Sequence, residues 1–182
     1  MTSGAEVLAA TVMDFDRPGV IWLDAAPVLI ELTGSERAVA RMLPGQSSWV
    51  EPSLQVGGSR RRDAAGAIDR WYRREARERI EAVTAVEADR LELEPGRVTI
   101  RDQRTRWGSC STSGTLSFNW RLVIGPGHAL RYVVIHELIH IRHHNHSRAF
   151  WSDLTEALPD WKHSADWLKA NERQLTAYKP RI

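Results

Sequence analysis

A pentapeptide with the sequence His136-Glu-Leu-Ile-His140 restricts the fold of this chain more than any other feature. Apolar residues recur around it at three- and four-residue steps, which predicts a helix that starts close to His128. Residues four apart on a helix lie about 40° apart around the axis and about 6 Å along it, so both imidazoles project from one face. The fold must therefore contain a helix whose histidine face can hold an ion, with Zn–N distances of about 2.0–2.1 Å if the ion is zinc.

Glu137 lies one step from the first histidine of this motif. Its carboxylate can reach a metal-bound water without becoming a ligand, which is the arrangement that metal-assisted hydrolysis requires. Chance would produce roughly 0.02 such motifs in a chain of this composition. We therefore prefer this interpretation to the alternative of two surface histidines beside an apolar stripe.

Five of the seven histidines lie between His136 and His146, so the third ligand is sought there first. A catalytic zinc ion usually has three protein ligands and leaves a fourth position open for water. If the helix continued, His143 and His144 would lie about 10–12 Å along the axis from His136, too far to share an ion with it. The chain must therefore leave the helix and turn back before it supplies a third ligand.

His146 is the predicted third ligand because turn-forming residues flank it. Asn145 can adopt the left-handed conformation that ends a helix, and Ser147 can cap the next one. His146 follows His140 by six residues, the spacing of the pattern H-E-x-x-H-x-x-G-x-x-H. Glu156 is the alternative third ligand, as a carboxylate further along the chain.

The segment before the predicted helix supplies candidates for the edge of a cleft. Trp107 and Gly108 lie on a predicted loop over residues 103–114, and a glycine allows the backbone to approach another group closely. This loop, or the strand at 115–119, is predicted to border the cleft and to pair with an extended peptide. For the aromatic side chains of this region we prefer a simpler role, which is to build the core under the helix; they are Trp107, Trp120, Phe150 and Trp151. The nearest downstream carboxylates that could accept the second N–H of a ligand histidine are Asp153, Glu156 and Asp160.

Hydrophobic periodicity predicts an α+β fold with a small antiparallel or mixed sheet. Strands are predicted at 20–23, 28–32, 97–101 and near 115–122, the last two as a hairpin, and helices at 63–91, from about 128, at 147–158 and at 160–176. We expect a single domain over residues 1–182. Residues 1–56 form its strand-rich N-terminal part and residues 63–176 its core.

Composition excludes several classes of protein. A single cysteine, Cys110, excludes a disulfide framework and an all-cysteine zinc module. Because no apolar run approaches roughly 18 residues and the N-terminus lacks a basic start, we expect a cytoplasmic protein without membrane spans. The net charge of +2 disfavours nucleic acid as a partner. A solvated helix face explains the arginines over residues 60–79, although a nucleic-acid surface there is an alternative.

Four sequence blocks stand out around the pentapeptide: Gln103-Arg-Thr-Arg-Trp-Gly-Ser-Cys-Ser111, Phe118-Asn-Trp-Arg-Leu122, Tyr132-Val-Val-Ile-His-Glu-Leu-Ile-His140 and Asn145-His-Ser-Arg-Ala-Phe-Trp151. Together they resemble the YgjP-like metal-dependent hydrolase family, which is related to the SprT and WLM metalloproteases. The resemblance is dense over residues 91–175. It implies a zincin-like fold, zinc bound by His136, His140 and His146, and a catalytic Glu137.

We therefore predict a small zinc metallopeptidase that cleaves peptides or unfolded proteins with a zinc-activated water and Glu137 as general base. The alternative is a module in which zinc holds the C-terminal helices together and the arginine-rich helix binds nucleic acid or a protein partner, including the case of a DNA-associated protease. A structural zinc site normally fills all four positions with protein ligands. No water would then be bound, and a carboxylate beside the metal, such as Glu137, would have no function. A third hypothesis is metal-dependent hydrolysis of an amide or ester outside proteins.

Overall fold

The computed structural model describes residues 13–14, 19–33, 35–37, 39–43, 53–58 and 60–180. The remaining parts of the predicted strand-rich segment 1–56 lie outside the described residues. In chain order the elements are β1 (Val20–Leu23), β2 (Ala26–Leu32), β3 (Ala40–Leu43), β4 (Ser53–Val56), α1 (Arg61–Arg90), β5 (Val98–Arg101), β6 (Gly108–Cys110), β7 (Leu116–Asn119), the 3-10 helix η1 (Trp120–Val123), α2 (Gly127–Ile139), α3 (Arg148–Ala157) and α4 (Trp161–Ala177).

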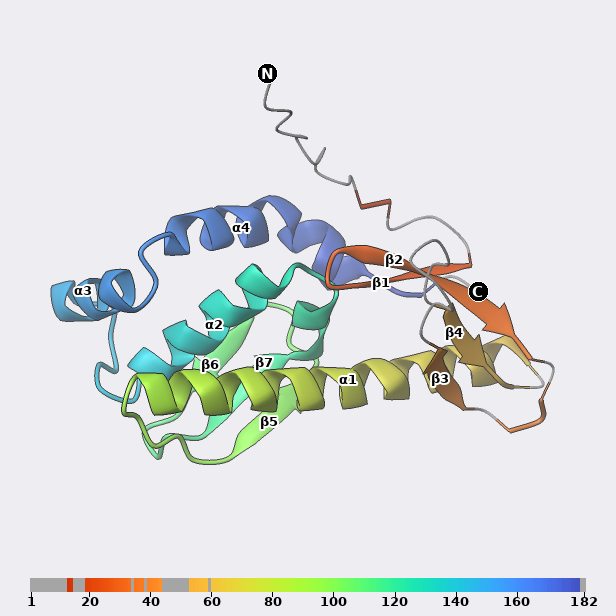
Figure 1. The fold of residues 1–182 in the computed structure, drawn as a ribbon, viewed down its shortest axis with the longest axis horizontal. Coiled ribbons are helices and arrows are strands. Elements are labelled where there is room, and N and C mark those ends of the chain that lie inside the picture. The colour runs from red at the N-terminus through yellow and green to blue at the C-terminus, as the bar shows by residue number, and fades with distance from the viewer. Residues whose placement is uncertain are drawn as a thin grey trace, which may run out of the picture.

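Helix α1 is an amphipathic helix of 30 residues that runs along most of the molecule (Figure 1). The helix predicted over residues 63–91 is thus confirmed. Its buried side repeats at helical spacing and consists of Ala64, Ala67, Ile68, Trp71, Tyr72, Ala76, Ile80, Thr84, Glu87 and Ala88. In Figure 1 the first half of α1 lies beside β3 and β4, and the second half lies beside β5 and α2. One helix therefore supports both sheets.

The N-terminal strands form a four-stranded sheet in the order β1-β2-β4-β3. β1 and β2 are an antiparallel hairpin whose turn residues, Asp24 and Ala25, have φ values of 52° and 58°. β2 then pairs parallel with β4, and β3 pairs antiparallel with β4. The strands predicted at 20–23 and 28–32 are confirmed. β3 and β4 were not predicted, because their sequences ARML and SLQV mix polar with apolar residues, whereas the equally short β1 is a continuous apolar run, VIWL.

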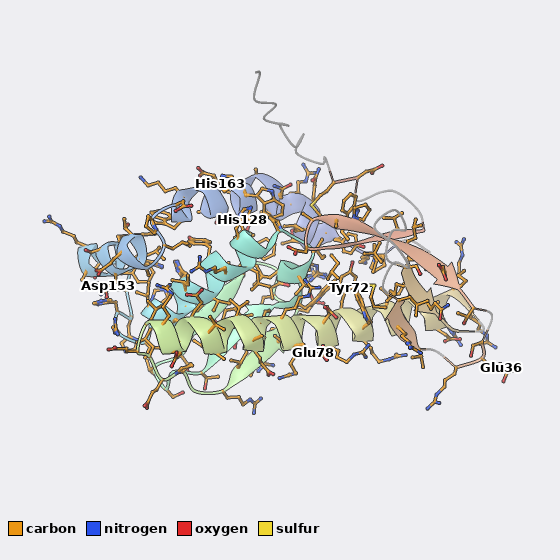
Figure 2. The ribbon with its side chains drawn as sticks, in the orientation of Figure 1. Glu36, Tyr72, Glu78, His128, Asp153 and His163 are labelled. Atoms are coloured by element: carbon orange, nitrogen blue, oxygen red, sulfur yellow. The ribbon has the colours of Figure 1, made fainter. Side chains whose placement is uncertain are left out.

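Tyr72 on α1 joins the N-terminal sheet to the rest of the fold (Figure 2). Its hydroxyl donates to the main-chain oxygen of Trp22 at 2.8 Å and accepts from the main-chain nitrogen of Trp22 at 3.1 Å. The hydroxyl of Tyr178, which follows α4, lies 3.2 Å away. Burial and the neighbouring Tyr178 raise the pKa of Tyr72 well above its ordinary value, so this hydroxyl remains a donor. The N-terminal strands, α1 and the C-terminal end of the chain therefore share one core.

The second sheet has the order β5-β7-β6 and lies next to α2. β5 and β7 run parallel, so the hairpin predicted between the strands at 97–101 and 115–122 is wrong. The hairpin instead joins β6 to β7, and β6 lies in the segment predicted as a loop. Its three residues, Gly108, Ser109 and Cys110, carry no hydrophobic alternation that would reveal a strand. β6 pairs with β7 on one side only, so it is an edge strand of this sheet, and it lies beside α2.

Helix α2 contacts the three other α-helices, namely α1 before the second sheet and α3 and α4 after it. The predicted helices from about 128, at 147–158 and at 160–176 are confirmed as α2, α3 and α4. The fold is mixed α+β, as predicted. Its main core contains residues of both sheets and of α1, α2 and α4, and a smaller apolar cluster lies between α2 and α3. The division of the chain at residues 56–63 stays a prediction. No described helix is long and apolar enough to cross a membrane.

Candidate metal centre

Three imidazoles converge at the C-terminal end of α2. His136 lies on the last turn of α2, His140 is the C-cap residue, and His146 comes from the segment before α3. One ring nitrogen of each lies within 4.8 Å of the others, and the Nε2 atoms of His136 and His146 are 3.0 Å apart. Nitrogens bound to one tetrahedral zinc ion would be about 3.3 Å apart, so the cluster has the dimensions of a metal site.

The protonation of these rings also suits a metal. Nδ1 of His140 lies 2.8 Å from the main-chain oxygen of His143 and donates to it, so Nε2 carries the free lone pair. Burial and the neighbouring rings of His140 and His146 lower the pKa of His136 to about 3. His136 is therefore neutral near pH 7, which is the form that binds a metal. The donor set fits a divalent cation that prefers imidazole ligands.

A tight turn between α2 and α3 brings His146 back to the helix. The side-chain oxygen of Asn145 accepts from the main-chain nitrogen of Ser147 at 3.1 Å. The Ser147 hydroxyl accepts from the main-chain nitrogen of Phe150 at 3.5 Å, so Ser147 caps α3 as predicted. The left-handed conformation predicted for Asn145 is wrong, because its φ is not positive. The side-chain turn of Asn145 makes the reversal without that conformation.

His143 and Glu156 do not join this cluster, and His144 lines the same cavity without belonging to the group of converging nitrogens. Nε2 of His143 is 2.8 Å from the carboxylate of Asp153, so Asp153 contacts His143 and not one of the converging imidazoles. Glu156, the alternative third ligand, lines a different cavity beside Arg90 and Arg142. Within the described ranges, only the three-histidine group has the geometry of a metal site.

Glu137 is buried beside the imidazole cluster, with 6% of its surface exposed. The backbone of β6 passes directly against it, because a Cβ added at Gly108 would lie 2.6 Å from Cγ and 2.7 Å from Oε1 of Glu137. Burial raises the pKa of Glu137 to about 7, although the charge of Arg106 acts in the opposite direction. A carboxyl group with this pKa can accept and return a proton near neutral pH.

The close contact between β6 and Glu137 leads to a prediction for Gly108→Ala. The added methyl group forces Glu137 or the strand to move, and we expect a loss of about 1–3 kcal/mol in the free energy of unfolding. Gly66→Ala is the matched control, since its Cβ meets only the Arg70 side chain at 3.4 Å and lies within α1. There the substitution should stabilise the protein by up to about 1 kcal/mol. Urea unfolding measures both, and equal stability of the two variants would contradict the prediction.

Because Glu137 is buried, we expect the free energy of unfolding of the metal-free protein to decrease as the pH rises. The unfolded carboxyl group ionises near the ordinary pKa of 4.5, whereas the folded one ionises near 7, so stability is lost as the pH rises from 4.5 through 7. We expect metal-free Glu137→Gln to be more stable than wild type by about 1–3 kcal/mol at pH 8 and equally stable at pH 4. Urea unfolding at both pH values tests this, with exposed Glu78→Gln as the control. A Glu137→Gln variant no more stable than wild type at pH 8 would refute it.

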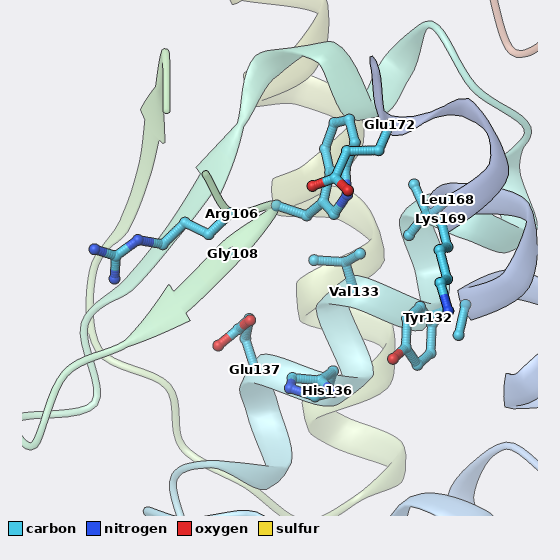
Figure 3. A pocket seen from close by; sticks show the side chains of 11 residues that line it. Arg106, Gly108, Tyr132, Val133, His136, Glu137, Leu168, Lys169 and Glu172 are labelled. Carbon is cyan, nitrogen blue, oxygen red and sulfur yellow. The ribbon is translucent and has the colours of Figure 1, made fainter. Parts of the chain in front are cut away.

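Two cavities share Gly108, His136 and Glu137 as wall residues. One, of about 360 Å³, lies between β6, α2 and α4 (Figure 3). The other, of about 370 Å³, is lined by β6 and by all three converging imidazoles. Cys110 belongs to the second cavity, where burial and the charge of Glu137 raise the pKa of its thiol. Together the cavities make a cleft along β6 that passes Glu137 and the imidazoles.

Phe150 and Trp151 on α3 hold the imidazoles in place. The Phe150 ring lies 4.6–4.8 Å from the ring centres of His136, His140 and His146. Trp151 stacks on His146 at 5.5 Å. The predicted core role of the aromatic residues fits the fully buried Phe150, whereas Trp151 is half-buried and lies over a candidate ligand.

Sequence reasoning did not single out Tyr132 and Trp161. Tyr132 lies edge-on to the His136 ring at 5.8 Å, and Trp161 stacks on Tyr132 at 6.2 Å. Position 132 begins one of the four family blocks and lies four residues before His136, therefore on the same helix face, and these were the available signals. Trp161 comes from α4, and no pattern in the sequence connects it to α2.

Two histidines four residues apart on a helix, a third imidazole and a buried carboxylate form an arrangement that is typical of metal-dependent hydrolases. The sequence matches the family described as YgjP-like, metallopeptidase domain, over residues 26–171. The chain therefore belongs to the YgjP-like family of metallopeptidases, which confirms the predicted family and enzyme class. Such a family implies a divalent metal and a peptide or protein substrate. The matched range begins in β2 and so includes β3 and β4.

Two solved structures match part of this chain. One is the metallopeptidase zymogen abylysin of Pyrococcus abyssi, with a TM-score of 0.48 and 21% identity over 57% of this chain and 99% of that one. The other is the metallopeptidase zymogen jannalysin of Methanocaldococcus jannaschii, with a TM-score of 0.43 and 24% identity over 52% of this chain and 94% of that one. Among curated proteins, none matches this chain.

Proposed function

We propose that this chain is a zinc-dependent peptidase in which His136, His140 and His146 bind the ion and Glu137 is the general base. The observation that carries the proposal is the convergence of three imidazole nitrogens within 4.8 Å, in a cavity that also contains Glu137. Three protein ligands leave one tetrahedral position for water, which is typical of catalytic zinc sites and not of structural ones. Imidazole ligands favour zinc among the abundant divalent metals.

Bound zinc would supply a Lewis acid that lowers the pKa of a water molecule and polarises the substrate carbonyl. Glu137 accepts a proton from that water as its oxygen attacks, and then delivers the proton to the leaving nitrogen. Without a metal, burial raises the pKa of Glu137 to about 7, and the positive charge of a bound zinc ion would favour the carboxylate form that accepts the proton. Gly108 keeps the carboxyl group in place, since any larger side chain would displace it.

Strand β6 is the proposed binding edge for the peptide. The main-chain oxygen of Trp107 accepts from Asn119, and the main-chain nitrogen of Ser111 donates to Thr115, so the odd-numbered residues face β7. The main-chain groups of Gly108 and Cys110 therefore point to the open edge of the sheet, along the cleft. An extended peptide can pair with them. Of the two predicted borders of the cleft, the segment at 103–114 is favoured, because β7 lies inside the sheet.

The ion pairs of α1 argue against the alternative function, a nucleic-acid-binding module. Arg73 pairs with Asp69 and Asp102, and Arg77 and Arg79 pair with Glu81 and Glu75. Arginines whose charge is balanced by adjacent carboxylates contribute little to phosphate binding.

The proposed function is tested with the full chain. Metal content is measured by mass spectrometry, and hydrolysis is followed with unfolded casein and with quenched fluorescent peptides. We expect stoichiometric zinc, and peptide cleavage that stops when 1,10-phenanthroline removes the metal and returns when zinc is restored. X-ray absorption should show three imidazole ligands and one oxygen. Four protein ligands, together with no cleavage of any peptide, would refute the proposal in favour of a structural zinc site.

A further inference from the structure

Tyr132 is a half-buried phenol in the cavity between β6, α2 and α4, and neither the sequence motif nor the proposed mechanism uses it. It shares this cavity with His136 and Glu137. Its ring is fixed on both sides, edge-on to His136 at 5.8 Å and stacked on Trp161 at 6.2 Å with an interplanar angle of 14°. Within the described ranges, its hydroxyl has no hydrogen-bond partner. The rigid ring of Tyr132 therefore presents its hydroxyl group to the cavity as a hydrogen-bond donor.

The stack behind Tyr132 continues to the third imidazole. Trp161 stacks on Trp151 at 5.0 Å, and Trp151 stacks on His146 at 5.5 Å. The indole nitrogen of Trp161 donates to the Thr155 hydroxyl at 3.1 Å, which fixes its orientation. The wall that carries Tyr132 is therefore built on the same helices that position His146.

Glu137 and Tyr132 approach the cleft from opposite walls. Glu137 is packed against β6, whereas Tyr132 is packed against α4, and the two side chains lie on either side of His136 in Figure 3. Peptide hydrolysis requires groups on both walls. The attacking oxygen loses its proton to a base on one side, and the former carbonyl oxygen gains negative charge on the other.

We propose that Tyr132 is a catalytic residue whose hydroxyl donates a hydrogen bond to the oxyanion of the tetrahedral intermediate. The inference rests on the proposed peptidase function. As the water oxygen bonds to the carbonyl carbon, the C=O π electron pair moves onto the carbonyl oxygen and Glu137 takes the water proton. Tyr132 keeps its own proton throughout. When the C–N bond breaks, the electron pair re-forms C=O, and Glu137 passes its proton to the amine.

The two cationic side chains that line this cavity are less suitable donors. Arg106 and Lys169 are both exposed at the cavity wall. Arg106 comes from the segment before β6, on the wall that already carries Glu137, and in Figure 3 its guanidinium points away from His136. Lys169 extends from α4 on a flexible four-carbon chain, so ordering it costs more than ordering a phenol that is already packed.

Tyr132→Phe is the test, because it removes one oxygen atom and keeps the ring and both ring contacts. We expect kcat to fall about 10²-fold, in the range for loss of one oxyanion donor, with KM changed less than threefold. Zinc affinity and the melting temperature of the metal-free protein should match wild type. A phosphonamidate peptide, which mimics the tetrahedral intermediate, should lose affinity by the same factor as kcat/KM. An uncleavable reduced-amide peptide of the same sequence should bind within twofold of wild type.

Three results would overturn the inference. The first is a Tyr132→Phe enzyme with kcat within twofold of wild type. The second is a loss that appears in zinc affinity or in both peptide analogues equally, which would indicate a structural role. The third is a kcat loss in Lys169→Met with none in Tyr132→Phe, which would assign the donor to Lys169. If wild type cleaves peptides and Tyr132→Phe equals it, only this inference fails. If zinc-loaded wild type cleaves nothing, the proposed function fails as well.

Discussion

Glu137→Gln is expected to lower kcat for peptide hydrolysis by about 10²–10⁴-fold while zinc remains stoichiometric. The amide has nearly the same shape as the carboxyl group and fits against Gly108, but it cannot accept the proton of the attacking water. Because the side chain is not one of the three converging imidazoles, its replacement should leave the metal site intact. Steady-state kinetics on a fluorescent peptide and metal analysis of the same preparation measure the two effects.

Glu156→Gln is the matched control for this variant. Glu156 lines the cavity beside Arg90 and Arg142, away from Glu137, so its kcat should match wild type. Full activity in Glu137→Gln would exclude the general-base role. Loss of zinc together with activity would indicate that Glu137 holds the metal instead.

His146→Ala is expected to weaken zinc binding by more than 10²-fold, and hydrolysis should fall in parallel at limiting zinc. The reason is that loss of a partner outside the ligand set already costs about 10–100-fold in metal affinity. The alanine side chain removes one of the three converging nitrogens, and two imidazoles four apart on α2 cannot hold the ion tightly by themselves. Competition with a chromogenic chelator measures the affinity.

His143→Ala separates loss of a ligand from loss of any nearby imidazole. The ring of His143 faces Asp153, and the main-chain oxygen that accepts from His140 is retained in the alanine variant. Zinc affinity should therefore stay within a few-fold of wild type. Unchanged affinity in His146→Ala, with a large loss in Glu156→Gln, would make Glu156 the third ligand.

The local part of the site follows from sequence spacing. His136 and His140 share a helix face because of the 3.6-residue period, and Glu137 lies beside that face. The long helix α1 was likewise readable, since its apolar residues keep helical spacing over many turns. The choice of His146 rested on turn chemistry. Ser147 does cap α3, whereas the left-handed Asn145 was wrong because its side-chain hydrogen bond makes the turn.

The pairing of the strands in the second sheet could not be predicted from the sequence pattern. β6 is three residues of small side chains, and it is defined by its pairing with β7 and not by any pattern of its own. The parallel pairing of β5 and β7 depends on how the segment between them returns to the sheet. Such pairing is set by contacts between distant residues, which local periodicity does not encode.

The sequence by itself determined that a helix carries two imidazoles and a carboxylate, because these groups are related by the helix alone. The tertiary structure decided which residues contact these groups and their neighbours on the helix. Gly108 of β6 packs against Glu137 and buries it, which raises its pKa, and Trp161 of α4 fixes the Tyr132 ring beside His136. Each of these two contacts joins residues 29 positions apart, and their existence depends on how the core packs the sheet and the C-terminal helices around α2.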